Sequence, residues 1–256
     1  MNKLQVGTMP IGNLKDITVR MIEAIEQADY ILCESIETFK SQCLEAGWKT
    51  NAKLIEYTYY DTSTQYVLEK EEIYNIAINA LKNNQNVLVV SEYGSMFIED
   101  PGSHLFHMIR SSELEITVLP GPSIVTTAYV ASGMDSSTNA KDDRIRGSFI
   151  FQPFYMIPKN EDKYKQILDL KDSFRTMVFI DKFLNLSFLL QTIDEIFGER
   201  GIAILSNLTQ DSEKIYLGKT KDAIEYFTGL QNKVLQTHEK TEITIVCEGK
   251  NLHDTI

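Results

Sequence analysis

The chain has 256 residues, 43% hydrophobic and 24% charged, which is ordinary for a globular enzyme and excludes disordered and fibrous classes. No run of about 18 apolar residues occurs, and the N-terminus lacks a signal-peptide pattern, so we expect a cytoplasmic protein with no membrane-spanning helix. The formal net charge of −11 disfavours nucleic-acid binding unless the few cations gather on one face.

The first half of the chain alternates short apolar runs with stretches of helical periodicity. Strands are expected at residues 3–8, 30–33, 53–57, 87–90 and 115–119. Helices are expected at residues 16–28, 39–46, 66–82 and 102–110. This strand-helix alternation predicts a largely parallel sheet.

Two loops of this half follow directly on strands. After residues 87–90 the chain reads SEYGSMFIEDPGS, in which Asp100 is an expected helix N-cap and Pro101 the first helical residue. After residues 115–119 it reads PGPS, in which Ser123 can cap the next helix. Open α/β sheets bind ligands at the carboxyl ends of their strands, so we expect both loops to line one cleft.

The second half continues as a mixture of strands and helices. Strands are expected at residues 148–152, 176–181, 201–207, 215–217 and 242–248, and helices at 123–133, 159–172, 186–197 and 221–229. We therefore predict an α/β protein with domains at 1–119 and 120–256, and a linker or flexible loop at 134–147. Two cation clusters are interleaved with acids and are expected to be solvated surface: Lys141, Arg144 and Arg146, and Lys159, Lys163 and Lys165.

Several common site motifs are absent. The loop after the first expected strand, at residues 9–13, has Gly7 before it and Gly12 within it, and these glycines do not form GxGxxG, so the dinucleotide fingerprint is missing. Cys33, Cys43 and Cys247 are odd in number without CxxC spacing, which argues against a disulfide framework and a structural zinc site. His104 and His107 lie three residues apart, but no third ligand stands at a recognised spacing, so no metal is expected.

Seven motifs between Val6 and Gly249 resemble the tetrapyrrole methylase superfamily: VGTMPIGNLKDITVR, CESIET, VSEYGSMFIEDPG, LPGPS, FGER, LTQDSEKIYLG and ITIVCEG. Within it they look most like the bacterial 16S ribosomal RNA (cytidine-2′-O)-methyltransferase branch. The resemblance implies two α/β domains of the tetrapyrrole methylase type with a ligand cleft between them. It also implies S-adenosylmethionine as methyl donor, a homodimer, and ribosomal RNA or the small ribosomal subunit as partner.

Carried over position by position, the resemblance assigns donor contacts to loop residues: Met9, Pro10, Ile11, Gly12, Gly94, Ser95, Ile98, Ser123, Ile124, Asp181 and Leu208. Methyl transfer from a sulfonium is an in-line displacement that depends mainly on alignment, while a hydroxyl acceptor also needs a base. Glu34 and Asp16 match acidic family positions and are the candidate bases. Alternatively, Asp16 stabilises a helix dipole and Glu34 hydrogen-bonds the neighbouring loop.

The departures from the family pattern lie at polar positions. The arginine of the family motif CEDTR is Glu37 here, and YESPHR and RELTK also lose their cations. Tyr93 and Met96 are expected to place an aromatic ring and a thioether beside the donor pocket. Three functions therefore stay open: an RNA methyltransferase, a methyltransferase of a small molecule or protein, and a non-catalytic module that binds the donor or a partner.

Overall fold

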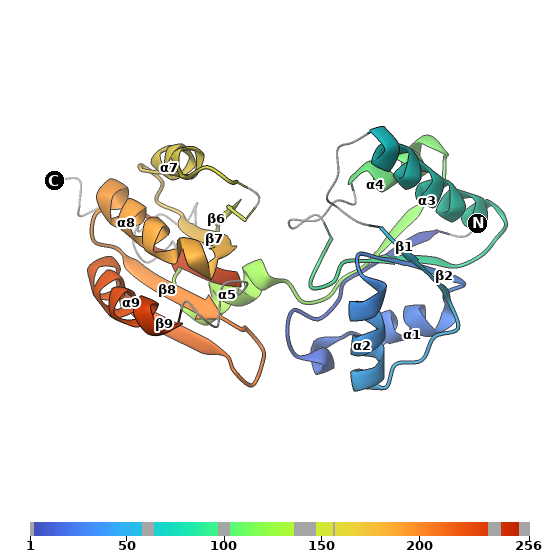
Figure 1. Ribbon diagram of the computed structural model, residues 1–256, viewed down its shortest axis with the longest axis horizontal. Coiled ribbons are helices and arrows are strands. Elements are labelled where there is room, and N and C mark those ends of the chain that lie inside the picture. Colours follow the sequence, from blue (N-terminus) through green and yellow to red (C-terminus); the bar gives the residue numbers. More distant parts are fainter. Residues whose placement is uncertain are drawn as a thin grey trace. The chain divides into compact units, whose positions relative to one another are not determined.

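The computed structural model describes residues 3–57, 64–96, 103–135, 147–155, 157–234 and 242–250. The chain forms two compact units, Met1–Ser123 and Ile124–Ile256, each with helices packed on one sheet (Figure 1). The expectation of two α/β domains is confirmed. Of the expected linker or flexible loop at 134–147, residues 136–146 lie outside the described residues.

The first unit contains a parallel sheet, as the alternating pattern predicts. Its strands are β1 (Leu4–Gly7), β2 (Tyr30–Cys33), β3 (Lys53–Glu56), β4 (Val87–Val90) and β5 (Ile116–Leu119). They lie in the order β3-β2-β4-β1-β5. All four residues of the central strand β4 are fully buried, which explains its uninterrupted apolar sequence VLVV.

Helices cover both faces of this sheet. On one face lie α1 (Val19–Gln27) and α2 (Ile36–Ala46), and on the other α3 (Thr64–Lys82) and α4 (Ser103–Ser111) (Figure 1). Alternate residues of β4 point to opposite faces, so Leu88 and Val90 pack with α1 and α2, and Val87 and Val89 with α3 and α4.

The helix starts follow from capping side chains. The helix expected at 16–28 is a short 3-10 helix, η1 (Leu14–Asp16), followed by α1, because the Thr18 hydroxyl accepts a hydrogen bond from the Met21 N–H at 3.3 Å. Likewise α2 begins earlier than expected, because Ser35 accepts from the Thr38 N–H at 3.1 Å. The expected cap of α4, at residues 100–101, lies outside the described residues.

The second unit contains a mixed sheet. Its strands are β6 (Phe149–Pro153), β7 (Thr176–Lys182), β8 (Gly201–Ser206), β9 (Lys214–Lys219) and β10 (Glu242–Cys247), in the order β6-β7-β10-β8-β9. Only the β6–β7 pair is parallel among these described pairings.

Helices also pack on both faces of the second sheet. On one face lie α7 (Asn160–Leu168), α8 (Leu186–Phe197) and α9 (Thr220–Val234), which bury residues such as Ile204 and Ile245. On the opposite face, α5 (Ile124–Ser132) lies against β7, β8 and β10. No described helix combines the length and the apolar character needed to cross a membrane.

Candidate functional site

The strand register brings four loops of the first unit to one edge. Gly7 is the register partner of both Val90 and Leu119, and Cys33 also pairs with Val90. The chain therefore leaves β1, β2, β4 and β5 at the same carboxyl edge of the sheet. This is the edge at which open α/β sheets bind ligands.

Direct hydrogen bonds join the loop after β1 to the loop after β4. The Met9 N–H donates to the Gly94 carbonyl at 2.9 Å, and the Gly94 N–H donates to the Met9 carbonyl at 3.0 Å. The Ser91 hydroxyl donates to the same Gly94 carbonyl at 3.0 Å. Gly94 has a φ of +67°, and a β-carbon there would lie 3.3 Å from Cγ2 of Ile11. This backbone conformation therefore favours glycine.

The PGPS loop is joined through Thr8 to the loop after β1. The Thr8 hydroxyl donates to the Leu119 carbonyl at 2.9 Å. A β-carbon on Gly121 would lie 2.9 Å from the Thr8 β-carbon, so only glycine lets the two loops approach this closely. Ser123 and Ile124, both half-buried, follow at the junction of the two units. Three of the predicted loops are therefore neighbours, while Ile98 lies outside the described residues.

Several side chains of these loops point into the core instead of toward the edge. Met9 and Pro10 are buried, and Met9 packs in the same cluster as Met21, so its contribution to the edge is its backbone. Met96 is 6% exposed and packs in the cluster under α3 and α4, which accounts for its thioether as a core side chain. Tyr93 is 57% exposed. Ile11, Gly12 and Ser95 are half-buried.

The two candidate bases differ in their surroundings. Glu34 is half-buried, and its Oε1 accepts a hydrogen bond from the Glu92 N–H at 3.0 Å. Glu92 in turn accepts from the Thr38 hydroxyl at 2.8 Å. Glu34 therefore joins the loop after β2 to the loop after β4. Asp16 is exposed at the end of η1, outside the first turn of α1, and its carboxylate contacts no described polar group.

The cysteines of the described chain are buried free thiols. Burial, followed by the negative charge of Glu56, raises the pKa of Cys33 to about 12. Burial also raises the pKa of Cys43 to about 11 and that of Cys247 to about 12. These thiols stay protonated near neutral pH and are poor nucleophiles. Among the described residues, no group of three or more His, Cys, Asp and Glu side chains could hold a metal ion.

The two predicted residues of the second unit share an edge of the second sheet. Asp181 and Ser206 are both register partners of Ile243, so Asp181 and Leu208 lie where β7 and β8 end. The Asp181 carboxylate is fully engaged inside the protein, by an ion pair with Lys163 and two hydrogen bonds. A ligand at this position would therefore meet the backbone. Lys163, expected to be solvated, is only 2% exposed, so that prediction is wrong.

The turn around Leu208 is strained. Leu208 is 4% exposed, and its neighbours Asn207 and Thr209 have φ values of 51° and 66°. A β-branched residue is costly in this left-handed region, and such strain concentrates at functional sites. The Thr209 N–H donates to Oε2 of Glu213 at 2.7 Å, which stabilises the turn. The sequence contains no glycine here that could have signalled this conformation.

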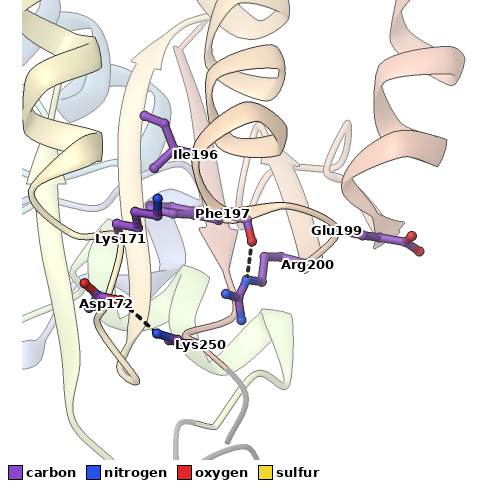
Figure 2. Close-up of a pocket in the computed structure, with 7 residues that line it drawn as sticks. All are labelled: Lys171, Asp172, Ile196, Phe197, Glu199, Arg200 and Lys250. Carbon is purple, nitrogen blue, oxygen red and sulfur yellow. Dashed lines mark hydrogen bonds and ion pairs between the residues drawn. The ribbon is translucent and has the colours of Figure 1, made fainter. Parts of the chain in front are cut away.

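A cavity of about 420 Å³ lies elsewhere, near the start of β8 and the end of β10 (Figure 2). It contains none of the predicted site residues; its lining is Lys171, Asp172, Ile196, Phe197, Glu199, Arg200 and Lys250. Arg200 is buried and donates to the Phe197 carbonyl at 3.1 Å and the Gly249 carbonyl at 2.9 Å. These bonds make Arg200 a link between the segments that flank β8 and β10.

Comparison with known proteins extends over nearly the whole chain. Residues 6–224 match the family model for Tetrapyrrole (Corrin/Porphyrin) Methylases. The chain is 30% identical over 250 residues to the Ribosomal RNA small subunit methyltransferase I of Thermotoga maritima, covering 98% of this chain and 100% of that protein. The chain is also 32% identical over 247 residues to the Ribosomal RNA small subunit methyltransferase I of Rickettsia prowazekii, covering 96% of this chain and 78% of that protein.

The fold resembles that of a solved methyltransferase. The uroporphyrin-III-C-methyltransferase from Thermus thermophilus matches with a TM-score of 0.60, covering 96% of this chain and 94% of that one. Sequence identity is 17%, so this similarity bears on the fold alone.

Proposed function

Because the chain belongs to the tetrapyrrole methylase family, it is an S-adenosylmethionine-dependent methyltransferase, and we propose that its acceptor is ribosomal RNA of the small subunit. One observation carries this proposal: the end-to-end similarity to a Thermotoga maritima protein whose name states that acceptor. The motif resemblance to (cytidine-2′-O)-methyltransferases makes the 2′-hydroxyl of a cytidine the acceptor group of the proposal.

The carboxyl edge of the first sheet suits the methyl donor. When bound, S-adenosylmethionine supplies an electrophilic methyl group on a sulfonium. Gly94 and Gly121 keep side chains out of the region where three loops meet, which leaves backbone groups able to approach a ligand closely. We propose that the donor contacts the loops after β1, β4 and β5, through Met9, Pro10, Ile11, Gly12, Gly94, Ser95, Ile98, Ser123 and Ile124.

In the second unit we propose donor contacts at the ends of β7 and β8, at Asp181 and Leu208. Asp181 would contribute its backbone, since its carboxylate already accepts from Lys163, Lys182 and Asn185. The strained turn at Leu208 supports a functional role for this segment, because such backbone conformations persist where function requires them.

For the acceptor proton we propose Glu34 as the base. It lies at the same edge as the donor loops, and the Glu92 N–H holds its Oε1 in place. A positioned carboxylate can remove a hydroxyl proton as the methyl carbon is attacked. Asp16 is the second candidate, because it lies in the loop after β1, although no described contact orients its carboxylate.

We further propose that the chain works as a homodimer in the cytoplasm, where ribosomal subunits are found. The edge strand β9 supports self-association, because its Leu217 is 59% exposed and its Ile215 is 39% exposed. Apolar side chains on an exposed edge strand favour pairing with another chain. Light scattering of the purified protein would give one mass, twice that of the chain, if the dimer forms.

The acceptor is tested by incubating the protein with radiolabelled S-adenosylmethionine and one acceptor at a time. The acceptors are unmethylated small ribosomal subunits, a porphyrinogen and a protein extract. Label in the ribosomal RNA supports the proposal. Label in another acceptor would identify the small-molecule or protein alternative. Calorimetric binding of the donor with transfer to none of them would identify the non-catalytic alternative.

A further inference from the structure

The carboxylate of Asp181, at the end of β7, is buried and bonded to three residues. Its Oδ2 forms an ion pair with Lys163 of α7, and the two side chains are 0% and 2% exposed. Its Oδ1 accepts a hydrogen bond from the Lys182 N–H at 2.8 Å and another from Nδ2 of Asn185 at 2.8 Å. The pair therefore fixes the turn between Lys182 and Asn185.

Stability alone does not explain why this pair is buried. Replacing a buried ion pair by apolar residues of similar volume is often neutral or stabilising. Apolar residues at 163 and 181 would, however, leave the Lys182 N–H and the Asn185 amide without their acceptor. The carboxylate thus supplies the acceptor for both of these donors, which apolar side chains could not do.

The turn presents one cation, Lys182. Its ammonium lies 4.5 Å from the centroid of the Tyr155 ring, and the side chain is half-buried. Within the described part of the chain Lys182 forms no ion pair, even with Glu242, its register partner on β10. Other lysines of this unit do pair with carboxylates: Lys163, Lys165, Lys219 and Lys250.

We propose that Lys182 contacts a phosphate of the RNA acceptor, and that Asp181 and Lys163 position it for this contact. The inference rests on the proposed function. Because the protein has a net charge of −11, binding of a polyanion such as RNA requires individual cations at the positions where the RNA contacts the chain. An ammonium held over an aromatic ring loses little conformational freedom on binding.

The cavity in Figure 2 offers a comparison. Its Lys171 is exposed and forms no ion pair to a described residue, whereas Lys250 pairs with Asp172 at 2.8 Å. Strand β8 begins beside this cavity at Gly201 and ends at Ser206, whose register places it near Asp181. Lys171 therefore lies toward the end of the second sheet opposite to Lys182. A Lys171→Gln variant is the control, because it also removes one positive charge but does so away from the proposed RNA contact.

The test is binding of small-subunit ribosomal RNA to the full chain as a function of salt. The slope of log K against log salt is negative, and losing one phosphate contact should reduce its magnitude by about 0.7. This corresponds to about five-fold weaker binding at 0.1 M salt. We expect this change in Lys182→Gln and not in Lys171→Gln, with donor affinity unchanged in both. Equal slopes in Lys182→Gln and wild type, or an equal loss in Lys171→Gln, would overturn the inference.

Positioning is tested with two double variants of similar core volume. Lys163→Met with Asp181→Asn keeps an acceptor for the turn, so RNA affinity should remain near wild type. Lys163→Met with Asp181→Leu removes the acceptor and should reproduce the Lys182→Gln slope, although thermal unfolding shows a folded protein. A folded Leu variant with the wild-type slope would contradict the positioning role. If wild-type protein neither binds nor methylates the RNA, the proposed function itself fails.

Discussion

Replacing Gly94 by alanine should weaken donor binding more than it weakens the fold. The residue has a φ of +67°, where a side chain costs about 1 to 2 kcal/mol. The added β-carbon would also lie 3.3 Å from Cγ2 of Ile11, so one of the two bridged loops must move by a few tenths of an ångström. Because the Met9–Gly94 bridge aligns the loops proposed to hold the donor, this shift should raise the donor Kd at least about ten-fold, or 1.4 kcal/mol.

Gly47 provides a matched control in the same unit. It has a φ of +72° at the end of α2, and no heavy atom lies within 4 Å of the position of its β-carbon. Gly47→Ala should therefore lose a similar unfolding free energy and keep the wild-type donor Kd. Thermal unfolding and titration calorimetry on both variants separate the two effects. If Gly94→Ala binds the donor as tightly as Gly47→Ala, the Met9–Gly94 bridge does not align the donor loops.

Further predictions concern the base and the thiols. Glu34→Gln should lower kcat at least about 100-fold with the donor Kd unchanged, while Asp16→Asn should keep a kcat near that of the wild type. Single-turnover methyl transfer measures both variants. The reverse ranking would make Asp16 the base. The native protein should react with a thiol reagent at pH 8 far more slowly than the unfolded chain, because a pKa of about 12 in place of 9.0 lowers the thiolate fraction of Cys33 about a thousand-fold. Burial raises the pKa of Cys33 and Cys247 in the folded protein, so the stabilisation from their neutral thiols is complete below pH 9 and is lost as the pH rises toward 12. The double variant Cys33→Ser with Cys247→Ser should therefore lose less unfolding free energy at alkaline pH than the wild type. An unchanged loss would assign the alkaline destabilisation to other groups.

The sequence was informative wherever local pattern and tertiary structure agree. The run VLVV predicted β4 with correct ends, since a central parallel strand is buried on both faces and needs apolar residues throughout. The helix Leu186–Phe197 also has the predicted ends, because its apolar periodicity stops at Gly198. The shared edge of the loops in the first unit followed from the predicted parallel sheet, because parallel strands end at the same edge.

Features that depend on long-range contacts were not predictable from the sequence. Lys163 lies in a charged helix and reads as solvated surface, but its partner Asp181 is 18 residues away on a strand. The positive φ at Thr209 could not be predicted from a glycine, because the position is a threonine and the turn is stabilised by a hydrogen bond to Glu213. Capping by Thr18 moved the start of α1, since a single hydroxyl decided between two possible helix starts.

The acceptor that we propose for methyl transfer is a ribose hydroxyl of small-subunit ribosomal RNA. Its most direct test is mass spectrometry of nucleosides from unmethylated small subunits incubated with the protein and S-adenosylmethionine. We predict that 2′-O-methylcytidine appears at one RNA position and forms at least about 100-fold more slowly when Glu34→Gln protein is used. RNA that gains no methyl group, under conditions where calorimetry shows the donor bound, would exclude this acceptor.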